Sequence, residues 1–170
     1  MKSLIAPRHG SAVLLLVLSV CCVAPCLAEQ PPADPLQPFA ALAGGTWLGE
    51  GTWPDGSPLK VEIRYFWGPT KRLLHFETYD LTSADKAILY EGFLLFDEKR
   101  GKVVQYNVKP TGEVSEQVVE SADSKGFAIN GPQTRSIVRY EEPDVFVWEL
   151  RVPEGSEWKL IMKAVHRRRP

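Results

Sequence analysis

The chain has 170 residues, of which 44% are hydrophobic and 10% aromatic, and its 20 basic and 21 acidic residues give a formal net charge of −1. This length predicts a single domain whose core is large enough to fold alone. The near balance of charge argues against a nucleic-acid partner, because such binding needs a broad basic surface.

Residues 1–28 have the pattern of a secretory signal peptide. Lys2 and Arg8 precede an apolar run at 12–23, and small residues close the segment before Glu29. The run is shorter than the roughly 20 residues that a membrane span needs. We therefore expect a mature protein that begins at Glu29, has no membrane span and is periplasmic or secreted. A lipoprotein is not expected, because no cysteine here follows the small residue that lipidation requires.

All three cysteines lie in this leader, at positions 21, 22 and 26. Cleavage would remove them together and leave 142 residues with 18 basic and 21 acidic side chains. Thiol catalysis, disulfides and cysteine-ligated metals are then excluded. We expect the core alone to stabilise the mature chain.

Residues 29–41 predict a proline-rich tether followed by a short helical turn. Prolines at 31, 32, 35 and 38 prevent regular helix or sheet. Leu36, Phe39 and Leu42 then approach helical spacing, and Gly44 with Gly45 indicates a stop. We expect this turn to plug one end of the domain that occupies residues 42–168.

From residue 46 onward the hydrophobic period is two, and turn residues separate the segments. Alternation is clearest at 59–67, where Leu59, Val61, Ile63, Tyr65 and Trp67 share one face. Ten strands are predicted, at 46–53, 59–67, 73–80, 88–96, 102–109, 113–121, 126–130, 134–141, 145–150 and 158–167.

Tight turns without helical crossovers require antiparallel neighbours, in either a sandwich or a closed up-and-down barrel. The barrel is favoured, since no long crossover is visible, and ten strands leave room for a small ligand. The predicted fold is therefore an all-β, single antiparallel up-and-down barrel with a short helical turn at its N-terminus.

No motif indicates catalysis. The sequence lacks a Gly-x-Ser-x-Gly elbow, a His-Glu-x-x-His pair and a phosphate-binding glycine loop. The mature chain has two histidines. Either face of the strand that contains His75 can be the buried one. His166 lies on the same face of the last strand as its apolar residues. We expect no metal, no resident cofactor and a binding protein more than an enzyme.

The aromatic residues supply the candidate ligand site. Rings with polar tips suit a cavity that holds an apolar body and orients one polar end, although they can equally fill a core. Arg139 would need an anion, such as a ligand carboxylate, if it faces inward, and is an ordinary surface residue if Val138 and Tyr140 face inward instead. The candidate ligand-binding residues are Tyr65, Trp67, Tyr106, Arg139, Trp148 and Trp158.

A resemblance rests on Gly45-x-Trp47-x-Gly49-x-Gly51, the ten-strand count and the hairpin motif Tyr90-Glu91-Gly92…Phe96-Asp97…Gly101. Together they resemble calycin barrels, namely lipocalins, fatty-acid-binding proteins and above all nitrobindin-like barrels with their secreted bacterial relatives. The chain departs from fatty-acid-binding proteins, since residues 54–58 are too few for two lid helices. Nitrobindin-like proteins bind haem through a last-strand histidine, and the pattern places Ile161 there, so His75 and His166 remain as candidate haem ligands.

Antiparallel pairing of the last strand with the first would bring the basic C-terminus to Trp47. Lipocalin-like barrels similarly pair a first-strand Trp with a last-strand Arg, so we expect Arg167 or Arg168 to stack on Trp47 in a structural role. Three functions remain open: a carrier or sensor of a small hydrophobic molecule, a haem protein with nitrogen-oxide chemistry, and an interaction module whose barrel is filled.

Overall fold

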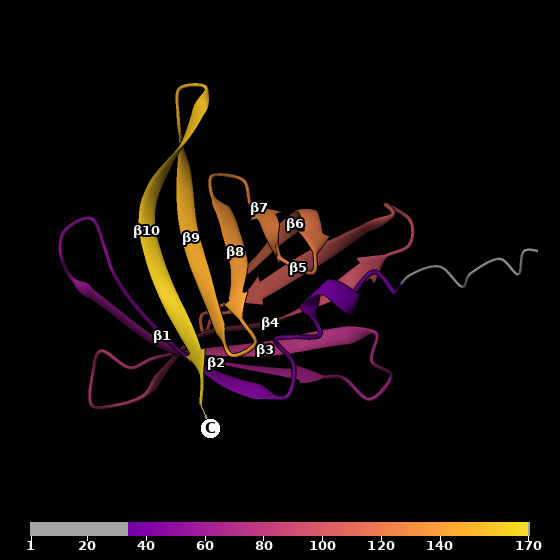
Figure 1. The fold of residues 1–170 in the computed structure, drawn as a ribbon, viewed down its shortest axis with the longest axis horizontal. Coiled ribbons are helices and arrows are strands. Elements are labelled where there is room, and N and C mark those ends of the chain that lie inside the picture. Colours follow the sequence, from indigo (N-terminus) through magenta and orange to yellow (C-terminus); the bar gives the residue numbers. More distant parts are fainter. Residues whose placement is uncertain (1–33, 170) are drawn as a thin grey trace, which may run out of the picture. The chain divides into compact units, whose positions relative to one another are not determined.

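A computed structural model describes residues 34–169, which belong to one compact unit. The expected signal peptide and the first half of the tether lie outside these residues. The described chain forms a 3-10 turn, η1, and ten strands (Figure 1). Their bounds are η1 Gln37–Phe39, β1 Gly45–Thr52, β2 Pro58–Trp67, β3 Leu73–Asp80, β4 Ala87–Asp97, β5 Lys102–Val108, β6 Val114–Asp123, β7 Gly126–Asn130, β8 Arg135–Glu142, β9 Val145–Glu154 and β10 Glu157–Arg168.

The ten strands form a closed antiparallel barrel in which every strand pairs with its sequence neighbours and β1 also pairs with β10. The predicted all-β up-and-down barrel is confirmed, and the sandwich alternative is wrong. Each predicted strand is present with its ends shifted by at most a few residues. The physical reason is that period-two alternation and turn residues agree over the whole domain.

One end of the barrel, the closed end, is filled by the segment 36–43. Leu36, Phe39 and Leu42 are buried, and the Phe39 ring packs against Phe127 with centroids 4.9 Å apart. The Tyr140 hydroxyl donates a hydrogen bond of 3.0 Å to the Pro38 carbonyl. The expected helical turn therefore plugs the barrel with side chains from η1 and its flanks. We call the other end, with the connections 53–57, 81–86, 109–113 and 131–134, the open end.

Arg168 stabilises the closed end through contacts with three other residues. Its guanidinium carbon lies 4.4 Å from the Trp47 ring centroid, in a cation–π contact. Nε donates to an Asp144 carboxylate oxygen at 2.8 Å, and Nη2 donates to the Ala41 carbonyl at 2.5 Å. The Trp47 indole is buried and donates to the Leu42 carbonyl at 3.0 Å. Of the two arginines expected at Trp47, Arg168 makes the contact, whereas Arg167 is exposed on the outer face.

Inward-facing glycines on β1 leave room for β10. A Cβ at Gly45 would lie 2.1 Å from Arg168 Nη1, and a Cβ at Gly49 would lie 2.3 Å from His166 Nε2. At Gly51 the obstacle would be the Lys163 carbonyl oxygen, 2.5 Å away. The Gly-x-Trp-x-Gly-x-Gly spacing therefore reflects the close approach of the strands that close the barrel.

We predict that Arg168→Ala lowers the free energy of unfolding by about 2 kcal/mol, because it removes the cation–π contact and two charge-assisted hydrogen bonds. Urea denaturation measures the change. Arg167→Ala is the matched control and should stay within about 0.5 kcal/mol of wild type, because its side chain is exposed. Equal stability of the two variants would contradict the role assigned to Arg168.

Candidate functional site

The candidate site is a cavity of about 510 Å³ inside the barrel. Its volume lies in the range of roughly 300–1,000 Å³ found for small-molecule sites. It extends from Leu42 of the plug to Trp53, Lys109 and Thr134 at the open end. Much of the wall is apolar, with contributions from Leu59, Val61, Ile63, Phe76, Leu94, Phe127, Ile129, Val138, Phe146 and Leu150.

A polar strip lies on the wall formed by β5 and β6. Gln105 and Asn107 from β5 face Gln117 and Ser115 from β6 as direct cross-strand partners. Gln105 Nε2 donates to Asn107 Oδ1 at 2.9 Å and to Gln117 Oε1 at 3.4 Å. The cavity therefore has a cluster of three carboxamides on one wall, with the hydroxyl of Ser115 beside it.

His166 lies on β10, five strands from β5 in either direction around the barrel and so on the opposite wall. It is 1% exposed, and its ring stacks on Phe146 at a centroid distance of 4.3 Å and an interplanar angle of 8°. Among the described residues neither ring nitrogen has a hydrogen-bond partner of normal geometry. A buried imidazole without partners is costly, which makes His166 a candidate polar contact for a ligand.

The environment keeps His166 neutral. Burial lowers its pKa to about 4, and the Ala164 backbone opposes this shift only in part. At neutral pH the imidazole therefore offers one donor and one acceptor and carries no charge.

The structure brings two of the expected ligand-binding residues to the cavity. Tyr65 from β2 and Trp148 from β9 both line it. Burial raises the pKa of the Tyr65 hydroxyl, which therefore stays protonated at neutral pH. Trp67 lies on the same inner face as Tyr65 but packs against the core at the closed end and does not line the cavity. Whether Tyr65 and Trp148 contact a ligand remains a prediction.

Trp158 does not line the cavity, in contrast to the expectation from parity. A β-bulge shifts the pairing of β10 with β9 between Leu160 and Met162. Leu160 consequently lies opposite Arg151 on the outer face, where it is 46% exposed, and Trp158 precedes it by two residues. Alternation counted back from His166 therefore fails beyond Met162.

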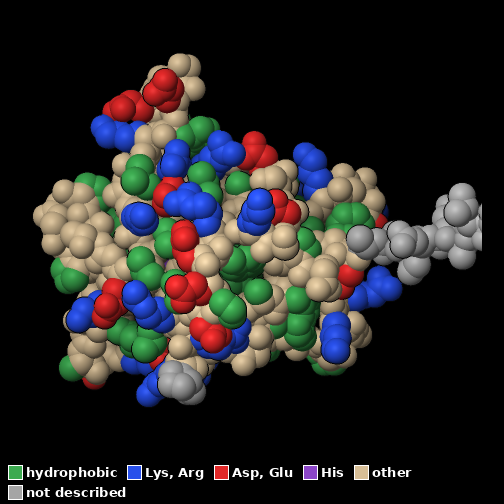
Figure 2. All heavy atoms as spheres, viewed as in Figure 1, with side chains coloured by type: hydrophobic (Ala, Val, Ile, Leu, Met, Phe, Trp, Pro, Cys, Tyr) green, Lys and Arg blue, Asp and Glu red, His purple; other side chains and the backbone are tan. Residues whose placement is uncertain are grey.

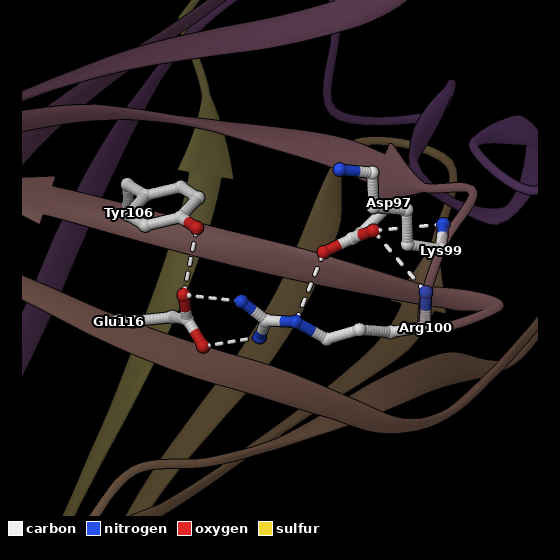
Figure 3. A network of polar contacts seen from close by, with 5 residues as sticks. All are labelled: Asp97, Lys99, Arg100, Tyr106 and Glu116. Carbon is white, nitrogen blue, oxygen red and sulfur yellow. Dashed lines mark hydrogen bonds and ion pairs between the residues drawn. The ribbon is translucent and has the colours of Figure 1, made fainter.

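Tyr106 lies on the outer face of β5, where its hydroxyl donates to Glu116 at 2.6 Å (Figure 3). Arg100 holds the same carboxylate with two nitrogens and contacts Asp97 through Nε at 3.0 Å. Hydrogen bonds from Arg100, and then from Tyr106, lower the pKa of Glu116 to about 2. This exposed network places Tyr106 outside the ligand cavity.

Arg139 also points outward, so the alternative in which it faces the cavity is wrong. It donates to Glu149, which is itself buried and also accepts a 2.6 Å bond from Arg151 Nη2. The hydrogen bond from Arg139, followed by that from Arg151, lowers the pKa of Glu149 to about 2. Val138 faces the cavity instead. The anion partner of Arg139 is therefore a protein carboxylate.

His75 faces outward from β3. Its ring stacks on Phe66, with centroids 5.2 Å apart and planes within 5°. Phe93 and then Tyr106 continue this row across β4 and β5 as direct cross-strand neighbours. The two histidines expected as candidate haem ligands thus lie on opposite faces of the sheet, and only His166 borders the cavity.

Sequence reasoning missed the carboxamides. In β5 the apolar residues Val104, Tyr106 and Val108 face outward while Gln105 and Asn107 face the cavity. In β6, Gln117 faces inward and its apolar neighbour Val118 does not line the cavity. Hydrophobic alternation therefore gives the wrong face at these positions, although Val103 and Val119 are buried inside. The available signal was register, because Gln105 lies opposite Leu94, an inward residue of β4.

The described residues contain no group of three or more His, Cys, Asp or Glu side chains arranged to hold a metal ion. Within the same part of the chain, no helix has the length and apolar character needed to cross a membrane. Figure 2 shows basic and acidic side chains interspersed over the visible face. The ion pairs of the described residues include Arg135 with Glu120.

No family model matches the chain, and no curated protein matches it. Solved structures similar to it include a redesigned β-barrel, at 12% identity over 76% of this chain and 93% of that chain, with a TM-score of 0.41. A de novo designed fluorescence-activating β-barrel has 13% identity over 74% and 92% of the two chains and a TM-score of 0.38. Both similarities concern barrel architecture only. Fold and site together define a closed ten-stranded antiparallel barrel with an internal cavity.

We predict that stability falls by about 2 kcal/mol between pH 7 and pH 5 because of His166. Its folded pKa of about 4 lies below the reference value of 6.5, so the unfolded chain binds more protons in this window. The contribution is fully present above pH 6.5 and is lost as the pH falls toward 4. Urea denaturation at pH 7, 6 and 5 measures it.

His166→Gln is the matched variant for this measurement, because glutamine keeps a polar group but does not titrate. Its stability should vary much less over the same pH range. The stability that Glu149 contributes through its lowered pKa is lost only below pH 4.5, which is outside this window. An unchanged pH slope in His166→Gln would show that another group causes the loss.

Proposed function

We propose that this protein binds a small, largely apolar molecule inside its barrel and acts as a carrier or sensor. The observation that carries the proposal is the cavity of about 510 Å³, which combines apolar walls with a few polar groups. Its plugged end directs ligand entry to the open end, where the cavity reaches Trp53 and Lys109.

The interaction-module alternative has less support, because a filled barrel would not contain a cavity of this size. An outer groove of about 250 Å³ borders Phe66, His75 and Phe93, but nothing in the structure identifies a partner for it. We therefore place ligand binding first.

Haem fits the site poorly. His166 is the imidazole at the cavity, but its ring lies flat against Phe146 and its Nε2 lies against the Gly49 backbone. Axial ligation needs a ring nitrogen directed into open space, so the side chain would have to turn out of its stack. A haem-binding function of the nitrobindin type has no further support from the described residues.

Kinship with calycin barrels is part of the proposal. The stacking of Arg168 on Trp47 at the closed end supports it, since the resemblance implied this pair. Export to the periplasm or the medium remains a proposal from residues 1–28. Intact-mass measurement should find a thiol-free protein that begins at Glu29, and retention of Cys26 or a lipid adduct would contradict it.

Fluorescence titration with N-phenyl-1-naphthylamine, a neutral apolar dye, tests the proposed function. Wild-type protein should bind the dye, and Ser136→Trp should weaken binding at least tenfold, because the indole would occupy the cavity that Ser136 lines. Ile137→Trp is the matched control, since this neighbour on β8 does not line the cavity. Circular dichroism checks that both variants fold. Equal dye binding by both variants would contradict an internal site.

A further inference from the structure

We infer that the cavity selects ligands with an uncharged polar group that carries a hydrogen-bond donor next to an acceptor, as in a primary carboxamide or a lactam. This inference rests on the proposed function and names its ligand class. The residues that carry it are Gln105, Asn107 and Gln117 on the polar strip of β5 and β6.

The first argument is the orientation of β5. Val104, Tyr106 and Val108 face outward, and the amides of Gln105 and Asn107 occupy inner positions that would hold apolar residues in a filled barrel. On β6, Val114 is 59% exposed while Ser115 and Gln117 line the cavity. Val104 is nonetheless fully buried on the outer face, and Val103 and Val119 are buried inside, so the polar inner positions are confined to this strip. Polar side chains at inner positions cost stability and are typical of functional sites.

The second argument is hydrogen-bond capacity. A carboxamide has two donors and an acceptor with two lone pairs, whichever way its oxygen and nitrogen are assigned. The two bonds within the cluster use the Gln105 amino group and one oxygen each of Asn107 and Gln117. The amino groups of Asn107 and Gln117 and the oxygen of Gln105 keep capacity for a ligand. A group with an adjacent donor and acceptor complements this set.

The third argument is charge. Among the described residues that line the cavity, Lys109 is the one with a charged side chain, and it is exposed at the rim and paired with Glu113 at 2.7 Å. Arg139 faces outward, and Arg168 is held by Trp47, Asp144 and the plug. His166 is neutral. A buried ligand carboxylate would lack a cation, and a buried ammonium would lack a carboxylate, so both are disfavoured.

The geometry also orients the ligand. The carboxamides and His166 lie on opposite walls, and the aromatic rings of Phe76, Tyr90 and Trp148 lie on the strands between them. A ligand whose polar group reaches β5 and β6 therefore presents its apolar body to Trp148 and to the apolar side chains of β2.

A series of ligands with one ten-carbon chain tests the inference by displacement of N-phenyl-1-naphthylamine at pH 7.5. Decanamide should bind at least tenfold more tightly than decanoate, which is ionised, and than decylamine, which is cationic. It should also bind more tightly than N,N-dimethyldecanamide, which keeps the acceptor but lacks the donor, because a site built for hydrogen bonds rejects analogues that leave its groups unpaired.

The double variant Gln105→Met and Gln117→Met keeps side-chain length and removes the amides, so the preference for decanamide over its dimethyl analogue should disappear. Tyr106→Phe is the matched control on the outer face of β5 and should keep the preference. If the double variant does not fold, Asn107→Leu removes one of the three amides and should reduce the preference. An unchanged preference in whichever of these variants folds would overturn the assignment to this strip.

The wild-type series separates this inference from the proposed function. Tighter binding of decanoate, or equal binding of all four compounds, would overturn the head-group selection but leave the apolar cavity as a binding site. Failure of the dye and of every compound to bind would overturn both.

Discussion

The pairing of β1 with β10 is the constraint on which the rest of the structure depends, because it converts ten consecutive hairpin strands into a ring without edges. We call this pairing the seam. The side chain of Arg168 stabilises it by contacting Trp47 of β1, Asp144 of the β8–β9 turn and Ala41 of the plug. A lysine would supply the charge but not the planar fork that makes these contacts together. Closure of the sheet and closure of the barrel end therefore depend on the same residue.

This seam also determines where a ligand site can be. Large side chains at the closed end are buried against the plug, so free volume remains in the middle and toward the open end. On the seam itself, glycines face large groups on β10, and Gly49 in particular gives His166 its place beside Phe146. The most crowded wall therefore holds the buried imidazole, while the wall five strands away holds the carboxamides.

The sequence predicted the fold well because period-two alternation, turn residues and the Trp–Arg pair depend on local chemistry and strand order. It predicted the site less well, for three identifiable reasons. The bulge between Leu160 and Met162 interrupts the alternation of inner and outer residues, so Trp158 does not face the cavity as expected. In β8, apolar residues occupy both faces, so the orientation of Arg139 was ambiguous until the register was known. At residues 104–108 and 114–118 the apolar side chains of β5 and β6 face outward, so Tyr106 was placed inside and the carboxamides were missed.

The carboxamides of β5 and β6 and the buried His166 contribute differently to ligand binding. The carboxamides hydrogen-bond to one another through the Gln105 amino group, and the amino groups of Asn107 and Gln117 stay available to a ligand. Among the described residues, neither ring nitrogen of His166 has such a partner, and a ligand reaches these nitrogens only if the ring turns out of its stack on Phe146. Discrimination at the carboxamides therefore comes from the cost of covering these groups with a ligand that cannot hydrogen-bond to them, while affinity comes from apolar contact. A cavity lined in this way would hold a neutral ligand and reject ions of either sign.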